Sequence, residues 1–118
     1  MAMIYPPQGQ GAESGGITTQ SVVTSERAFG VEYQNNTGKP MWVAITTKVS
    51  KISNQAAAHR FYSDNVEVGA QNVPLITGYS IGDYYLVATT TFIVLPGKTY
   101  EATTSVASDT IENWTEWY

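Results

Sequence analysis

A nine-residue alternation between Met41 and Val49 constrains the fold of this chain more than any other feature. One side of an extended strand would carry Met41, Val43, Ile45, Thr47 and Val49, and the other side Trp42, Ala44, Thr46 and Lys48. Just before it, residues 35–40 combine side chains that tolerate positive φ with a proline that fixes φ, which predicts a turn. The segment therefore reads as a turn followed by a strand.

The same pattern recurs along the chain. Besides 41–50, we expect strands at 17–24, 27–33, 59–63, 66–70, 84–95, 99–106 and 111–118, and a loop at 51–58. Asp64-Asn65 favours a tight hairpin, and Pro96-Gly97 favours a type II turn. These short strands, separated by turn residues, predict an all-β fold: a single antiparallel β-sandwich of about 7–8 strands.

In such a sandwich the apolar residues at the inward strand positions form the core. We expect the core to contain Val31, Tyr33, Met41, Val43, Ile45, Phe61, Val66, Val68, Leu86, Phe92, Val94, Tyr100, Ala102 and Trp114.

A change of composition near residue 25 divides the chain. Residues 1–25 contain Pro6-Pro7 and several glycines among Gln, Ser and Ala, so we interpret them as an extended N-terminal arm, and 26–118 as the β-sandwich domain. Met3, Ile4 and Tyr5 would give this arm a small apolar anchor that docks on a partner. The alternative is a disordered leader.

The charge and the cysteine content of the chain limit which classes of partner and which kinds of site are expected. Six basic and ten acidic residues give a net charge of −4 without a basic patch, which disfavours nucleic acid and anionic membranes. No apolar run approaches the roughly 20 residues of a membrane span, and the first residues lack the regions of a signal peptide, so we expect folding in the cytoplasm. The absence of cysteine excludes disulfides and thiolate metal sites.

The titratable residues predict no enzyme, no metal site and no cofactor. His59 is the only histidine, and beside Arg60 at a strand start we expect it on the surface. The two local carboxylate pairs are Asp64 with Glu67 and Glu112 with Glu116. Hairpin formation accounts for Asp64, and we expect Glu112 and Glu116 to be exposed strand residues.

Binding is better supported than catalysis. Trp42 alternates with the inward residues of its strand and should point outward. We expect a ligand-binding set of Trp42, Tyr62, Asn65, Tyr79 and Tyr85, because aromatic rings beside amides and hydroxyls suit neutral or weakly charged glycans. The same aromatic residues would also suit contacts between subunits, and the sequence leaves both readings open.

A second candidate surface is apolar on both sides of its strand. It comprises Phe92, Ile93, Val94 and Leu95, to which we add the terminal Trp117. One face of a small sandwich normally meets water, so this segment is either central in the sandwich or half buried in a neighbouring subunit. We therefore predict a homo-oligomer.

Four sequence elements occur in order over about residues 29–118. They are a tyrosine with an N-x-T-G-K-P turn, a hairpin around Asp-Asn, a strand ending in F-x-V before P-G, and W-x-E near the end. In this chain they correspond to Tyr33, Asn35, Thr37, Gly38, Lys39, Pro40, Asp64, Asn65, Phe92, Val94, Pro96, Gly97, Tyr100, Trp114 and Glu116. Taken in this order, they resemble the small C-terminal β-sandwich domains of bacteriophage tail fibres, which bind receptors at the distal end of the fibre.

The resemblance implies a virion protein assembled in the host cytoplasm, most often a homotrimer, that attaches to host surface polysaccharide or another receptor through weak contacts repeated across subunits. One alternative is a structural virion protein, either a capsid decoration or a tail accessory subunit, docked on other virion proteins through its N-terminal arm. A non-viral carbohydrate-binding module is a further alternative.

Overall fold

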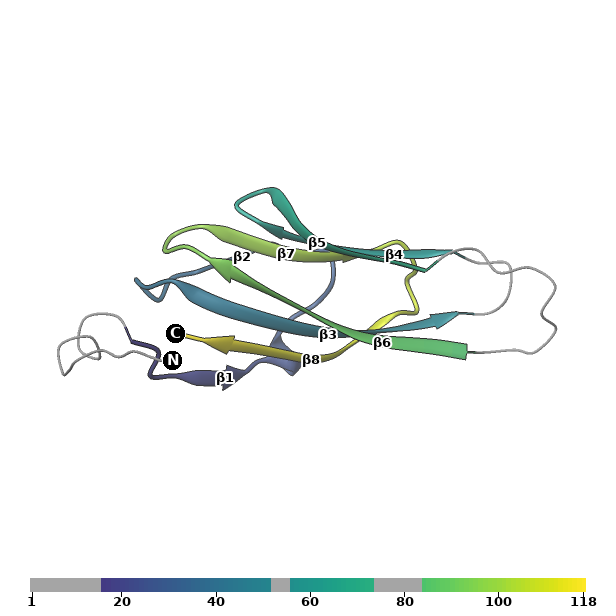
Figure 1. Cartoon of the computed structure of the whole chain (residues 1–118), viewed down its shortest axis with the longest axis horizontal. Helices are drawn as coiled ribbons and strands as arrows, with labels where there is room; N and C mark the ends of the chain where they lie inside the picture. Colours follow the sequence, from purple (N-terminus) through teal and green to yellow (C-terminus); the bar gives the residue numbers. More distant parts are fainter. Residues whose placement is uncertain (1–15, 52–55, 74–83) are drawn as a thin grey trace, which may run out of the picture.

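Two antiparallel sheets face each other in the computed structural model, which describes residues 16–51, 56–73 and 84–118 (Figure 1). Sheet A has the order β1-β8-β3-β6, with β1 at Gln20–Val22, β8 at Thr110–Trp117, β3 at Met41–Lys51 and β6 at Tyr84–Val94. Sheet B has the order β2-β7-β4-β5, with β2 at Tyr33–Gln34, β7 at Thr99–Thr104, β4 at Ala57–Ser63 and β5 at Val66–Val73. The predicted all-β sandwich is confirmed, and within the described residues no helix is long and apolar enough to cross a membrane.

Strand β3 lies at the centre of sheet A, as its alternation predicted. It pairs with β6 on one side and with β8 on the other. The five inward residues Met41, Val43, Ile45, Thr47 and Val49 are all buried, whereas Trp42 on the other side is 43 % exposed. A strand with a partner on both edges and one covered face is strongly fixed in register, because a one-residue slip would turn its apolar side chains into water.

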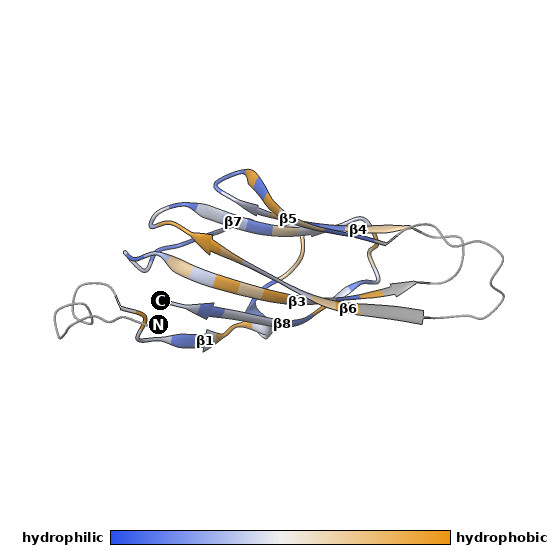
Figure 2. Cartoon of the chain, in the orientation of Figure 1, coloured by the Kyte–Doolittle hydropathy of each residue, from blue (hydrophilic) through white to orange (hydrophobic). Residues whose placement is uncertain are grey.

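The main core fills the space between the sheets. It consists of Val23, Met41, Val43, Ile45, Phe61, Phe92, Val94, Tyr100, Ala102 and Trp114, with Phe29, Tyr33, Ile111 and Tyr118 packed at its border. Figure 2 shows apolar stretches in β3 and at the arrowhead end of β6. Most of the predicted core is therefore confirmed.

Three predicted core residues are wrong: Val31, Val66 and Val68 are exposed. Val31 follows a turn with Gly30 at φ +78°, and the strand expected at 27–33 shrinks to the two residues of β2. A bulge shifts the register of β4 and β5 from Phe61↔Gly69 to Tyr62↔Glu67, so Val68 is the extra residue. Val66 lies at the hairpin end, opposite Ser63. The side chain of Leu86 lies outside the described part.

Part of the segment expected to be an arm belongs to the sandwich. Strand β1 pairs with β8 in sheet A, and Val23 is buried in the core. The backbone N–H groups of Thr18 and Thr19 both donate to the carbonyl of Tyr118, at 3.0 and 2.7 Å. The sandwich therefore includes residues before position 26, the expected domain start. The proposed anchor Met3, Ile4 and Tyr5 lies outside the described residues.

Both predicted tight turns are confirmed by their backbone angles. Asp64 and Asn65 have φ of +54° and +63°, which is the pattern of a type I′ hairpin turn between β4 and β5. Gly97 has φ +77°, and the N–H of Lys98 donates to the carbonyl of Leu95 at 3.1 Å, as in a type II turn. The latter turn carries the chain from β6 in sheet A to β7 in sheet B.

Asn35 ties this crossing to the turn before β3. Its side-chain Nδ2 donates to the carbonyls of Lys39 and Val94, at 2.8 and 2.9 Å, and its Oδ1 accepts from the N–H and the hydroxyl of Thr37. The N–H of Gly97 donates to the Asn35 carbonyl at 2.9 Å. Two of the turns on which the tail-fibre resemblance rests are thus hydrogen-bonded to each other at one end of the sandwich.

Of the segment predicted as a loop at 51–58, residues 52–55 lie outside the described part of the chain. Lys51 still belongs to β3, and Ala57 and Ala58 already belong to β4. The loop is therefore shorter than expected at both ends.

Candidate functional site

The outward side chains of sheet A form a surface, here called the Trp42 face, that is almost free of charge. Its described members follow from the strand register, and they are Gln20, Val22, Trp42, Ala44, Thr46, Lys48, Val87, Thr89, Thr91, Ile93, Thr110, Asn113, Thr115 and Trp117. Lys48 is the charged residue among them, and Thr110 donates a 2.6 Å hydrogen bond to Glu112, the extra residue of the β8 bulge. Lys48 pairs with Val87 and Thr110, toward the end of the sheet where β3 and β8 form a bulge.

An apolar row crosses the other end of this face. Trp42 lies directly opposite Trp117 of β8 on one side and Ile93 of β6 on the other. Side chains at opposed positions of antiparallel strands have Cβ atoms about 4.5–5.5 Å apart, so the three form one continuous strip. Trp42 and Ile93 are 43 % and 40 % exposed, and Trp117 is half-buried. The strip can therefore be reached from solvent.

Hydrogen bonds hold several side chains of the Trp42 face in place. The indole N–H of Trp117 donates to Gln20 Oε1 at 2.9 Å, and the Thr46 and Thr89 hydroxyls share a hydrogen bond of 2.7 Å. Thr115 Oγ1 donates to Asn113 Oδ1 at 2.7 Å. For the indole N–H of Trp42 no partner occurs within the described chain. A platform fixed in this way loses little side-chain entropy when a ligand binds to it.

Three of the five predicted ligand-binding residues have described side chains, and these three do not lie together. Trp42 faces outward from sheet A, whereas Tyr62 alternates with the buried Phe61 and faces outward from sheet B. Asn65 lies in the β4–β5 hairpin, where its positive φ is part of the turn. Tyr79 lies outside the described residues, and so does the side chain of Tyr85, although its backbone belongs to β6. Among the members of this set whose side chains the structure describes, Trp42 alone is on the Trp42 face.

The predicted oligomer surface divides between the inside and the outside of the sandwich. Phe92 and Val94 are 5 % and 0 % exposed and belong to the core of their own chain, so a second subunit has no access to them. Ile93 and Leu95 are 40 % and 52 % exposed. Trp117 and Ile93, expected at an interface, lie beside Trp42, expected in a ligand site. The structure therefore brings members of the two predicted sets into one strip.

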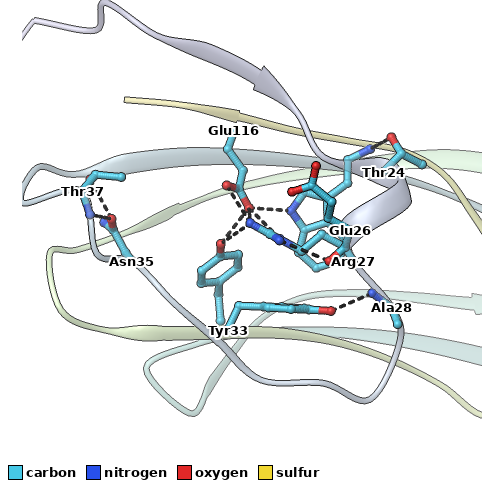
Figure 3. Close-up of polar contacts among 10 residues, drawn as sticks. Thr24, Glu26, Arg27, Ala28, Tyr33, Asn35, Thr37 and Glu116 are labelled. Carbon is cyan, nitrogen blue, oxygen red and sulfur yellow. Dashed lines mark hydrogen bonds and ion pairs between the residues drawn. The ribbon is translucent and has the colours of Figure 1, made fainter.

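A polar cluster around Glu116 lies between the sheets, on the inner side of sheet A (Figure 3). Arg27 Nε and Nη2 donate to the two carboxylate oxygens at 3.1 and 3.2 Å, and the Tyr100 hydroxyl and the Trp114 indole N–H donate to Oε2 at 2.7 and 3.0 Å. The guanidinium carbon of Arg27 also lies 4.6 Å from the ring centre of Tyr33. Glu116 is only 4 % exposed, so its expected exposure is wrong.

The pKa values within this cluster follow from burial and from the carboxylate. Burial is the largest effect on Tyr100 and raises the pKa of its hydroxyl strongly, and the hydrogen bond to Glu116 and the charge of Glu116 raise it further. For Arg27 burial acts to lower the pKa, but the hydrogen bonds and charge of Glu116 outweigh it, so the pKa is raised. Both groups are therefore held in their protonated forms around Glu116, as a structural ion pair requires.

A second buried polar group contains His59, which is fully buried and so contradicts the expected surface position. Its Nε2 lies 2.7 Å from Asp109 Oδ2, and its Nδ1 lies 2.9 Å from Thr47 Oγ1. Thr47 in turn donates to Gln71 Oε1 at 2.9 Å, and Thr104 donates to Asp109 at 3.1 Å. His59 and Asp109 thus connect β4 to the segment before β8, and within the described residues no three His, Cys, Asp or Glu side chains are arranged to hold a metal ion.

Sequence reasoning missed the partners in both clusters. Arg27 and Glu116 are separated by 89 positions, and His59 and Asp109 by 50. One signal in the sequence was available. Glu116 follows Trp114 by two residues, and two residues at this spacing lie on the same side of an extended strand, which for Trp114 is the buried side. A strict alternation would have assigned Glu116 to the inside.

Comparison with protein-family models, with curated proteins and with solved structures finds no match to this chain.

Proposed function

We propose that this chain is a bacteriophage virion protein that attaches to the host cell surface by binding a neutral glycan on the Trp42 face. The observation that carries this proposal is the strip of Trp117, Trp42 and Ile93 across three neighbouring strands, at the end of the face away from Lys48 and Glu112. The proposed placement in a virion is supported by the order of the tail-fibre-like turns and strands. The proposed ligand class is supported by the chemistry of the strip.

A flat, partly exposed aromatic strip suits the C–H faces of sugar rings, which are apolar and present no charge. Thr89 and Thr91 lie next to the strip on β6, and their hydroxyls, like the indole N–H of Trp42, can exchange hydrogen bonds with sugar hydroxyls. A single shallow platform of this kind binds weakly. Repetition of the platform over many copies on a particle would raise the overall affinity through effective concentration.

Binding of the purified protein to intact host cells and to a panel of neutral and acidic surface polysaccharides tests this proposal. We expect saturable binding to a neutral polysaccharide, and Trp42→Ala should lower the affinity at least about tenfold, which corresponds to roughly 1.4 kcal/mol. Tyr62→Ala is the matched control, because it removes an aromatic ring from the outer side of sheet B. Equal loss of binding in both variants, or no binding to any polysaccharide, would contradict the proposal.

The alternative, a structural virion protein, rests on the same strip, because Trp and apolar side chains are also enriched where proteins meet. A reconstitution experiment separates the two functions. Particles assembled with Trp42→Ala should contain the normal amount of the protein and adsorb poorly to cells if the strip binds a glycan. If the Trp42→Ala protein is instead not incorporated into particles at all, the strip is an assembly surface.

A further inference from the structure

Strand β6 is an edge of sheet A along its whole length. It pairs with β3 from Met41↔Val94 to Lys51↔Tyr84 without a register shift, and β3 is its only pairing partner in the described part of the chain. In an antiparallel ladder alternate residues direct their N–H and C=O groups away from the partner strand. The 11 residues of β6 therefore present a straight row of donors and acceptors on the side away from β3.

The other three sheet edges are protected in ways that β6 is not. Strand β1 has three residues and β2 has two, so neither offers much backbone to a partner. Strand β5 is longer, but it has a bulge opposite Phe61 and Tyr62, and it carries Glu67, which lies 3.6 Å from Arg60 Nε. Short strands, bulges and charges are the usual means by which proteins prevent pairing at an edge.

The sequence of β6 contains none of these means. It reads YYLVATTTFIV, without a charged residue, a proline or a glycine. Within the described residues, side chains contact β6 on this side at three places: Ser63 Oγ donates to the Ile93 carbonyl at 3.0 Å, Asn35 Nδ2 donates to the Val94 carbonyl at 2.9 Å, and Gln71 Nε2 of β5 donates to Thr90 Oγ1 at 2.9 Å. The backbone groups of Val87 to Thr91 that point away from β3 have no hydrogen-bond partner in the described part of the chain, and Val87 is 53 % exposed.

We propose that the β6 edge pairs with the β6 edge of a second copy of this chain, antiparallel and related by a two-fold axis. Such a partner must supply an equally long, straight and uncharged strand edge, and β6 is the one described edge of this chain that does so. Two identical antiparallel strands are self-complementary: if one residue of the first copy faces a second residue of the other copy, the second residue of the first copy also faces the first residue of the other. No like charges meet across this contact.

Pairing of this kind joins the two copies of sheet A into one continuous sheet. Because the two-fold axis is perpendicular to the sheet, both Trp42 faces lie on the same side of the dimer. The contact also uses up the β6 edge of both copies, so the assembly closes at two. A dimer therefore replaces the trimer expected from the tail-fibre resemblance.

The test combines a mass measurement with variants that carry introduced charges of either sign on β6. By light scattering we expect the wild-type chain to have a mass of about twice 12.9 kDa. The double variants Val87→Lys with Thr91→Lys and Val87→Glu with Thr91→Glu should each remain folded by circular dichroism and be monomeric, since like charges would face each other across the edge. A one-to-one mixture of the two variants should associate again.

Val22→Lys is the matched control, because it puts the same charge on the opposite edge strand of the same sheet, where it should leave the dimer intact. A monomeric or trimeric wild-type chain would overturn the proposal. So would a dimer that survives in both charged double variants, or one that Val22→Lys dissociates. If the charged variants lose their folded structure, Thr89→Lys alone is measured in the same way, and a folded dimeric Thr89→Lys would also overturn it.

Discussion

The hydroxyl of Tyr100 donates a 2.7 Å hydrogen bond to Oε2 of Glu116, and this contact joins the two sheets of the sandwich through their interior. Tyr100 comes from β7 in sheet B, and Glu116 from β8 in sheet A. Arg27 balances the carboxylate charge, and Trp114 donates a further hydrogen bond to it. A buried carboxylate with this many donors is stable only while each donor keeps its proton.

The first prediction concerns alkaline pH. The folded-state pKa of Tyr100 is raised, first by burial and then by the bond to Glu116. In the unfolded chain tyrosine ionises near pH 10, so above that pH the unfolded state releases a proton that the folded state retains. The free energy of unfolding contributed by this group is therefore fully present below about pH 10 and is lost as the pH rises toward the folded-state pKa.

Tyr100→Phe isolates this effect. The variant should be less stable than the wild type near pH 8 by about 1.5–3 kcal/mol, the contribution of a hydrogen bond to a charged group. The difference should shrink as the pH rises above about 10, because only the wild type loses the Tyr100 contribution. Urea unfolding at a series of pH values measures this difference in the free energy of unfolding. The contributions of the other tyrosines are the same in both proteins and cancel when the two values are subtracted. A difference that stays constant up to pH 11 would contradict the assignment.

The second prediction compares two glutamates of β8. Glu116→Gln keeps the shape of the side chain but replaces one acceptor oxygen with an N–H₂ donor that would face the donors of Arg27 and Trp114. Breaking one partner of a largely buried ion pair should lower the free energy of unfolding by about 3 kcal/mol.

Glu112→Gln, made on the same strand at an exposed position, is the control for this comparison. It should change stability by less than about 0.5 kcal/mol. Urea unfolding followed by tryptophan fluorescence compares the two variants directly. If they turn out equally stable, the cluster around Glu116 does not contribute to the fold.

Sequence periodicity predicted the sheets well because one buried face leaves a local mark on each strand. The inward residues of β3, and Tyr100 and Ala102 of β7, are buried as expected. The two tight turns were predictable for a similar reason, since positive φ at Asn65 or Gly97 is a property of the residue itself.

Several of the failures involve partners that the local sequence does not contain. His59 was expected on the surface because a lone histidine beside an arginine usually lies there, yet Asp109 and Thr47 accommodate it in the interior. Val68 was misplaced because a bulge depends on the pairing of two strands. The strip of the Trp42 face was predicted in part only, since Trp42, Trp117 and Ile93 become neighbours through the order of β8, β3 and β6.

The third prediction concerns the side of the sandwich where side chains of β5 contact Thr90 of β6. A Cβ atom added to Gly69 would lie 2.7 Å from the Cγ2 methyl of Thr90, which is closer than two non-bonded carbon atoms normally approach. Thr90 cannot turn its methyl aside easily, because it is β-branched and its Oγ1 accepts a 2.9 Å hydrogen bond from Gln71 Nε2. Gly69→Ala should therefore force the strands apart and lower the free energy of unfolding by about 1–3 kcal/mol.

A double-mutant cycle distinguishes this clash from a general intolerance of Gly69 to substitution. Thr90→Ser removes the Cγ2 methyl but keeps the hydroxyl that Gln71 contacts, so alone it should cost less than about 1 kcal/mol. Combined with Gly69→Ala it should restore most of the lost stability, giving a coupling free energy of about 1–2 kcal/mol in urea unfolding. Additive effects would mean that the methyl of Thr90 is not what excludes a side chain at Gly69.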